Sequence, residues 1–130
     1  GGSAAGNERM RIGGTGVVTL SNRILNKQGV DVASATAITL GVDGNSFEIT
    51  GTTQIDQIVS TNWQNGAEVT LVFNESVTVR NAIATDGSNI TILLAGAANF
   101  SATAKDTLKL MLSETTASGQ AWIEVGRSVN

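Results

Sequence analysis

The feature that most constrains the fold is a series of short runs in which apolar residues occupy every second position. In the run from Ala67 to Phe73, Val69, Leu71 and Phe73 follow this period of two. Such a period places the three side chains on one face of a β-strand, whereas an amphipathic helix requires a stripe with a period near 3.6. No helical stripe of useful length occurs from Thr36 onward. The pattern therefore predicts an all-β protein.

Turn-forming residues separate these runs, because Gly, Asn and Asp tolerate the backbone angles of tight turns. Short strands that alternate with such turns are typical of an antiparallel sandwich or barrel. The last two strands, joined by a Ser/Thr/Gly turn, are expected to form a closing hairpin. The expected strands are Thr36–Leu40, Ser46–Thr50, Gln54–Val59, Ala67–Phe73, Val77–Arg80, Ile90–Leu94, a strand with Leu108, Leu110 and Leu112, and a strand with Trp122.

The first third of the chain follows a different pattern. Residues 1–6 have the composition of a flexible linker or expression scar. The segments 7–12 and 15–20 flank Gly13-Gly14 and predict a short hairpin, which is too small to be stable alone in water. Residues 21–33 have mixed apolar spacing, which fits either a helical turn or a loop.

Composition excludes several classes of function. The chain of 130 residues fits one compact domain with a short extra segment. It has no cysteine and no histidine, which removes disulfides, thiolate metal sites and the usual general base, and we expect no cofactor. The net charge of −3 argues against a nucleic-acid partner. No apolar run is long enough for membrane insertion. Charged residues make up only 15% of the chain, so Thr, Ser, Asn, Gln and Gly must cover most of the surface.

Several segments resemble the distal β-domains of bacteriophage tail fibres, tailspikes and neck appendages. Residues 8–12, Glu-Arg-Met-Arg-Ile, are similar to a strand that recurs in such proteins. The ordered series across the second half is more specific, and it covers about residues 46 to 128. Its segments are Ile49–Ile58, Gly66–Phe73, Leu94–Phe100, Asp106–Leu108 and Trp122–Ser128.

The resemblance implies a homotrimeric virion protein with a jelly-roll-like β-sandwich at or near the tip of a fibre. Residues 7–34 would then be a shaft-end hairpin and connector, and residues 35–130 a sandwich that trimerises. The implied function is to cap the fibre, hold three chains in register and present loops to a polysaccharide or receptor on the host surface. A purely structural trimerisation module is the alternative without a ligand.

Trp63 lies in a polar loop with Asn62, Gln64 and Asn65, which makes this loop the candidate site for a glycan or receptor. The indole of a Trp has an apolar face that stacks on sugar rings and a polar N–H. The opposing interpretation is that Trp63 folds back over one end of the sandwich. The amide side chains of Asn62, Gln64 and Asn65 are compatible with both interpretations of the loop.

The candidate trimer interface combines apolar residues of the hairpin with outward residues of the closing hairpin. Trp122 is out of phase with Ile123 and Val125, so an isolated sandwich would expose it, whereas a trimer would bury it against a neighbour. We expect it to pack, within the subunit or across the interface, and not to bind a ligand. Arg127 lies close in sequence to Glu124 and is expected to form an ion pair. The interface candidates are Met10, Ile12, Val18, Met111, Trp122 and Arg127.

Catalysis is the remaining alternative. A glycoside hydrolase needs two carboxylates about 5 to 9.5 Å apart. Glu48 with Asp56, and Glu68 with Glu75, are the candidate pairs. The enzyme alternative is a polysaccharide-degrading tailspike whose acids lie at subunit boundaries. Eleven acids scattered over a β-surface produce such pairs by chance, so we expect no enzyme. The Asp43-Gly44-Asn45 and Asp86–Asn89 segments lack the full ligand pattern of a calcium loop, and turn chemistry explains both.

Overall fold

The computed structural model describes residues 9–115 and 119–130, and in this part of the chain it is all-β, with one short 3₁₀ turn at Ala95–Ala97. Residues 1–8, which include the expected linker and the start of the first expected strand, lie outside the described residues. The strands are β1 (Met10–Ile12), β2 (Val18–Leu20), β3 (Val32–Ala33), β4 (Ala37–Ile38), β5 (Ser46–Thr50), β6 (Gln57–Val59), β7 (Glu68–Phe73), β8 (Val77–Val79), β9 (Asn89–Leu93), β10 (Phe100–Ala102), β11 (Thr107–Thr115) and β12 (Gly119–Ser128).

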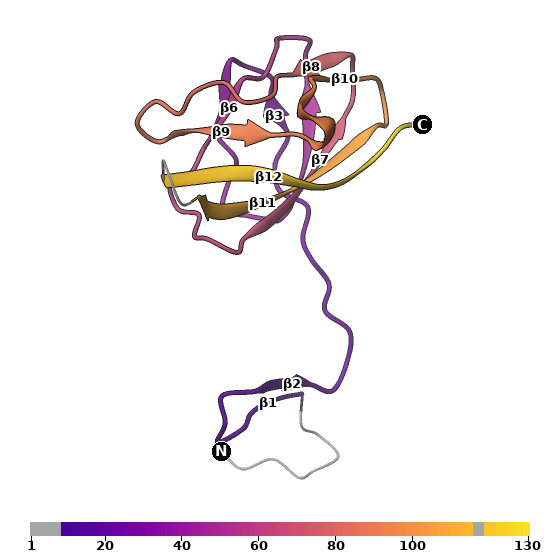
Figure 1. Cartoon of the computed structure of the whole chain (residues 1–130). Helices are drawn as coiled ribbons and strands as arrows, with labels where there is room; N and C mark the ends of the chain where they lie inside the picture. The colour runs from indigo at the N-terminus through magenta and orange to yellow at the C-terminus, as the bar shows by residue number, and fades with distance from the viewer. Residues whose placement is uncertain (1–8, 116–118) are drawn as a thin grey trace.

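Eight of these strands form one sheet in the order β3-β5-β7-β11-β12-β9-β6-β4. The two end strands, β3 and β4, are consecutive in the chain. The backbone N–H of Ser34 donates to Thr50 O on one side, and the N–H of Asp56 donates to Thr36 O on the other. The sheet therefore nearly closes on itself, and we call this closed unit the barrel (Figure 1).

The strand pairing is mixed, and the expectation of an antiparallel arrangement throughout is wrong. The pairs β3–β5, β5–β7, β4–β6 and β9–β12 are parallel. The chain runs from β5 to β6 and then from β6 to β7, and β6 is a neighbour of neither strand in the sheet. These two connections therefore cross the barrel and do not form hairpins. The closing hairpin of β11 and β12 is confirmed, with antiparallel register from Thr107 opposite Ser128 to Thr115 opposite Gly119.

The core lies inside the barrel and is formed by every second residue of its strands. Phe47 and Ile49 of β5 are buried, as the alternation predicts. The small sheet of β8 and β10 packs its inner side chains on the same core, and the ring of Phe100 meets the ring of Phe73 edge-on at 5.9 Å. The core cluster consists of Ile38, Leu40, Phe47, Ile49, Ile55, Ile58, Val69, Leu71, Phe73, Val77, Val79, Ile90, Ile92, Leu94, Phe100, Ala102, Leu108, Leu110, Leu112 and Trp122.

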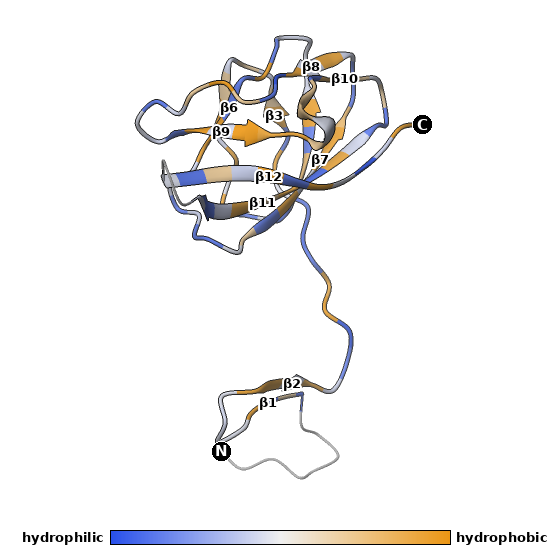
Figure 2. Ribbon diagram, viewed as in Figure 1, coloured by the Kyte–Doolittle hydropathy of each residue, from blue (hydrophilic) through white to orange (hydrophobic). Residues whose placement is uncertain are grey.

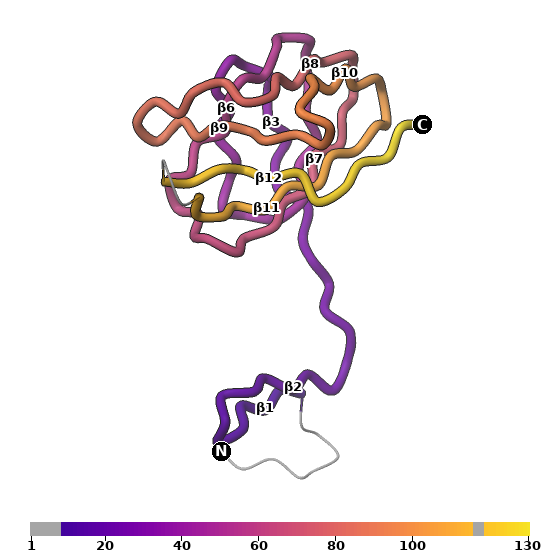
Figure 3. The backbone as a smooth tube through the Cα atoms, viewed as in Figure 1, coloured from indigo at the N-terminus to yellow at the C-terminus, as the bar shows by residue number. Residues whose placement is uncertain are grey.

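The hairpin of β1 and β2 stands apart from the barrel at the end of an extended connector (Figure 3). Residues 21–33 contain no helical turn, and apart from the short strand β3 and the bridge at Gln28 they form a loop, which was one of the two structures that their spacing allowed. Pairing with the barrel begins at Gln28, which bridges Ser46. The Gly29 N–H donates to Ser46 O at 2.8 Å, and Asp43 Oδ2 accepts from the Val30 N–H at 2.8 Å. Asp43 thus fastens the connector to the barrel.

Gly44 is expected to be intolerant of any side chain, because the connector lies directly over it. A Cβ at this position would meet the backbone oxygen of Lys27 and the backbone nitrogen of Gly29. We expect Gly44→Ala to lower the free energy of unfolding by about 1–3 kcal/mol, the usual cost of overpacking. Denaturant unfolding measures this loss. Gly126→Ala is the control, since its Cβ would meet nothing within 4 Å, and equal losses in the two variants would contradict the prediction.

Candidate functional site

The hairpin carries an apolar face that nothing in the described chain covers. In the register, Met10 lies opposite Leu20 and Ile12 opposite Val18, so the four side chains share one face of the two-stranded sheet. Arg11 and Thr19 lie opposite each other on the other face. The apolar residues are 59%, 67%, 55% and 39% exposed for Met10, Ile12, Val18 and Leu20, respectively. Three of the candidate interface residues therefore lie together on one exposed surface.

The connector extends this apolar surface toward the barrel. Ile24, Leu25 and Val30 are 68%, 75% and 74% exposed. Figure 2 shows hydrophobic residues along both the hairpin and the connector. The interface candidates chosen from the sequence omit these three residues, although their apolar character in a segment with no regular period was a usable signal.

Trp63 does not project from its loop as a free stacking surface. Its ring packs edge-on against Phe47 at 6.4 Å and against Trp122 at 6.0 Å, and it adjoins the core cluster. Its indole N–H is buried without a hydrogen-bond partner in the described structure. This placement favours the interpretation in which Trp63 folds back to cover one end of the barrel.

The neighbours of Trp63 are exposed. Asn62 adopts a left-handed conformation with φ of 69°, which asparagine tolerates in tight turns. Gln64 is exposed as well, and Asn65 Oδ1 accepts from Gln120 Nε2 at 2.8 Å, which ties the loop to β12. The four residues of the candidate loop are thus brought together, but they present amides and no aromatic face.

Trp122 is completely buried within the single chain. Packing within the subunit is therefore confirmed, and the inference that an isolated chain would expose Trp122 is wrong. Trp122 lies opposite Leu112 of β11 and Ile92 of β9, and both of these are buried. Trp122 lies on the opposite face of β12 from Ile123 and Val125, as predicted. However, the face that carries Trp122 points into the barrel, and the face that carries Ile123 and Val125 points outward. Trp122 therefore offers no surface to a neighbouring subunit in this conformation.

Met111 lies at the middle of β11, whereas Arg127 lies near the end of β12. Met111 is half-buried on the outer face, opposite Ile123. Arg127 forms the expected ion pair with Glu124, and its guanidinium lies 4.4 Å from the centre of the Phe100 ring. Hydrogen bonds from Arg127 hold the pKa of Glu124 below its ordinary value, and the same contact raises the pKa of Arg127. The ion pair therefore makes its contacts within one chain, between the end of β12 and the segment from Ala95 to Phe100.

Asp106 is a buried carboxylate that holds the loop before β11 and the residues after β12. Its Oδ2 accepts from the Thr103 N–H at 2.8 Å, and its Oδ1 accepts from the Asn130 N–H at 2.8 Å. Asn130 Nδ2 also donates to Lys105 O at 2.7 Å. The hydrogen bond from Asn130, followed by that from Thr103, lowers the pKa of Asp106.

The lowered pKa of Asp106 predicts a loss of stability in acid. Its contribution is fully present above the ordinary value of 3.8 and is lost as the pH falls through the lower folded-state value. We expect the unfolding midpoint to fall with pH in this range, and Asp106→Asn to remove part of that slope. Unfolding measured as a function of pH tests this, with Asp31→Asn, at an exposed connector position, as the control. An unchanged slope in Asp106→Asn would contradict the assignment.

Three of the four carboxylates considered for catalysis are engaged with a neighbour, and the fourth, Glu75, is exposed. Glu48 Oε2 accepts from Asn74 Nδ2 at 2.7 Å, and Asp56 Oδ2 lies 3.3 Å from Arg80 Nη1. Glu68 Oε2 lies 3.5 Å from Lys109 Nζ. Within residues 9–115 and 119–130, no three acidic side chains are grouped so as to hold a metal ion. The described part of the chain also contains no helix that is long and apolar enough to cross a membrane.

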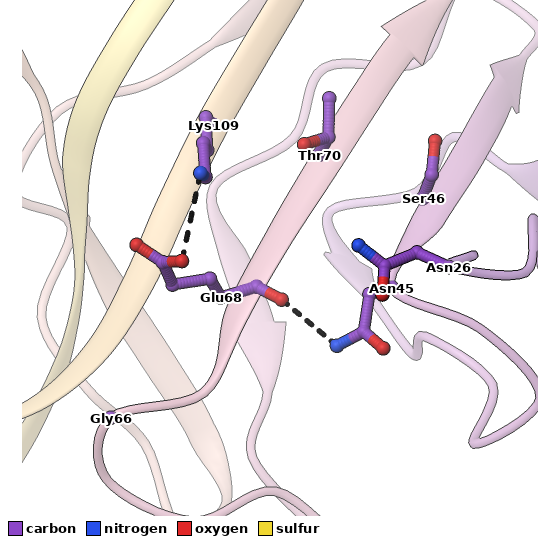
Figure 4. Close-up of a pocket in the computed structure, with 7 residues that line it drawn as sticks. All are labelled: Asn26, Asn45, Ser46, Gly66, Glu68, Thr70 and Lys109. Carbon is purple, nitrogen blue, oxygen red and sulfur yellow. Dashed lines mark hydrogen bonds and ion pairs between the residues drawn. The ribbon is translucent and has the colours of Figure 1, made fainter. Parts of the chain in front are cut away.

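A polar groove lies on the outer face of the barrel where the connector joins it (Figure 4). It has a volume of about 350 Å³ and is lined by Asn26, Asn45, Ser46, Gly66, Glu68, Thr70 and Lys109. The sequence singles out only two of these polar residues, both in other roles: Glu68 as a catalytic candidate and Asn45 as a turn residue. The missed signal was the polar half of the alternation, because Ser46, Thr70 and Lys109 occupy outward positions of β5, β7 and β11.

Comparison of the chain with protein-family models, with curated proteins and with solved structures finds no match.

Proposed function

We propose that the chain is a structural module of a homotrimeric phage fibre or appendage, in which the hairpins and connectors of the three copies pack together. The observation that carries this proposal is the exposed apolar face of the hairpin, made by Met10, Ile12, Val18 and Leu20. A two-stranded hairpin is marginal in water, and three or more strands with a covered apolar face are needed for stability.

Identical copies are suitable partners for this face. It carries no charge, since Arg11 lies on the opposite side, so bringing several copies together involves no repulsion between like charges at the contact. Each large side chain that becomes buried contributes about 1.5–3 kcal/mol. The barrel's own core is already filled by its strands, and the connector separates the hairpin from it (Figure 1).

Two other parts of the proposal, the trimeric state and the location in a virion, are supported by other observations. The resemblance of the chain to tail-fibre and tailspike segments supports a trimer at or near the tip of a fibre. The Thr-, Ser- and Asn-rich exterior of the barrel suits a module exposed outside the cell. The barrel then caps the assembly, and the hairpins hold the three chains in register.

Light scattering on the full chain at micromolar concentration tests the proposal. The expected result is a species of three times the 13.3 kDa chain mass. A stable monomer that keeps its barrel structure by circular dichroism would overturn it. A stable dimer would retain the role of the apolar face but overturn the trimer.

A further inference from the structure

The groove beside the connector is lined by polar side-chain groups that lack a hydrogen-bond partner within the described chain. The Asn26 amide, the Ser46 hydroxyl and the Thr70 hydroxyl make no hydrogen bond in the part of the chain that the structure describes. Asn45 donates its Nδ2 to Glu68 O at 3.0 Å, and its Oδ1 has no partner there. Amide and hydroxyl groups from three different segments thus converge on one hollow of about 350 Å³ (Figure 4).

The floor of the groove is a straight row across three strands. Ser46 of β5 lies beside Thr70 of β7, and Thr70 lies beside Lys109 of β11. Neighbouring strands are about 4.8 Å apart, so the row is about 10 Å long. Asn26 of the connector and Gly66 of the turn before β7 complete the lining. A ligand of the length of a disaccharide fits along this row.

The charge of the groove favours a neutral ligand. Its two charged residues, Glu68 and Lys109, have opposite signs and lie 3.5 Å apart, so the lining has no net charge. Both side chains are about half exposed, and such pairs contribute only about 0–1 kcal/mol, so either side chain is free to turn toward a ligand hydroxyl. The lining contains no aromatic or large aliphatic residue, which disfavours a lipid or an aromatic ligand.

The position of the groove on the sheet also disfavours an extended peptide. Peptides that add to a sheet use the unpaired backbone groups of an edge strand. Here β5 pairs with β3 and β7, and β7 pairs with β5 and β11, so the floor is the face of fully paired strands. Only side chains are available for recognition, and a ligand with many hydroxyl groups is the best match for them.

We propose that this groove is a binding subsite for a neutral saccharide, with Asn26, Asn45, Ser46 and Thr70 as its hydrogen-bonding residues. The groove begins at Gly66, just after the loop of Asn62 to Asn65, but none of the four loop residues lines it, and all of its lining residues belong to one chain. Because no aromatic ring is present for stacking and each hydrogen bond replaces one to water, we expect a dissociation constant on the order of 1 mM.

Titration of the isotope-labelled full chain with glucose, N-acetylglucosamine and lactose, followed by amide NMR shifts, tests the subsite. The expected result is saturable shifts at Ser46, Thr70 and Lys109 with at least one sugar. Thr70→Val, which keeps the shape and removes the hydroxyl, should weaken binding about tenfold or more. Thr50→Val, on the outer side of β5 but outside the groove, should leave it unchanged.

Three outcomes would overturn the proposal. The first is no saturable shift in the groove with any of the sugars. The second is shifts confined to the loop of Asn62 to Asn65. The third is equal binding by an uncharged Ser/Asn-rich peptide, which would assign the groove to protein contacts. None of these results affects the oligomeric mass, so failure of the subsite and failure of the trimer are distinguished by separate measurements.

Discussion

Replacing Trp122 by alanine is expected to lower the free energy of unfolding by about 3–5 kcal/mol, the range for truncation of a large buried aromatic residue. Trp122 is fully buried between Leu112 and Ile92, and its ring meets Trp63 at 6.0 Å. A domain of this kind is stable by about 5–15 kcal/mol in total. The variant should therefore approach unfolding at ambient temperature.

Chemical denaturation followed by far-ultraviolet circular dichroism measures this loss. Val125→Ala is the matched control, since Val125 lies on the same strand, is 47% exposed, and should change stability by about 0.5 kcal/mol or less. Wild type and variants must be compared at one protein concentration, because association adds to apparent stability. Equal losses for the two substitutions would show that Trp122 is not a core residue.

Trp122→Phe separates two contributions to this effect. The indole N–H of Trp122 is buried and has no hydrogen-bond partner in the described structure. Phenylalanine removes that unpaired donor, and it leaves a smaller cavity than alanine does. The loss should therefore be clearly smaller than the loss in Trp122→Ala.

The alternation of apolar residues predicted most strands correctly, because a buried face imposes a period of two on the sequence. Phe47 and Ile49, and Val69 and Leu71, confirm this. On β12 the rule failed, because the inward positions there include Glu124 beside Trp122. The side chain of Glu124 is only 4% exposed, and it is satisfied by Arg127 and by the N–H of Ala95.

Strand partners were harder to predict than strand positions. Turn residues mark where a strand ends, but a connection such as residues 51–56 leads either to the neighbouring strand or across the barrel. The mixed pairing depends on long-range contacts that local composition does not encode. The groove was missed for a related reason. Ser46, Thr70 and Lys109 are ordinary outward residues in sequence and become neighbours only through the register of three strands.

Ile12→Asp is expected to weaken association of the chain by at least about 100-fold, which corresponds to about 2.8 kcal/mol. In the proposed trimer the substitution removes a large apolar contact in every copy and places three like charges near one another. Each lost Ile contact costs about 1.5–3 kcal/mol, so the predicted 100-fold is a lower bound. The barrel should keep its structure, because Ile12 is 67% exposed and lies outside the core cluster.

Sedimentation equilibrium over a range of concentrations, with circular dichroism on the same samples, measures both quantities. Thr19→Asp is the control, since it adds the same charge to the same hairpin on the opposite face, next to Arg11. If the apolar face is the contact, Ile12→Asp dissociates the assembly and Thr19→Asp leaves it nearly intact. Equal weakening by both substitutions would mean that charge alone disturbs the hairpin. If neither has an effect, the chains associate through the barrel, and the half-buried Met111 on its outer face becomes the next residue to replace.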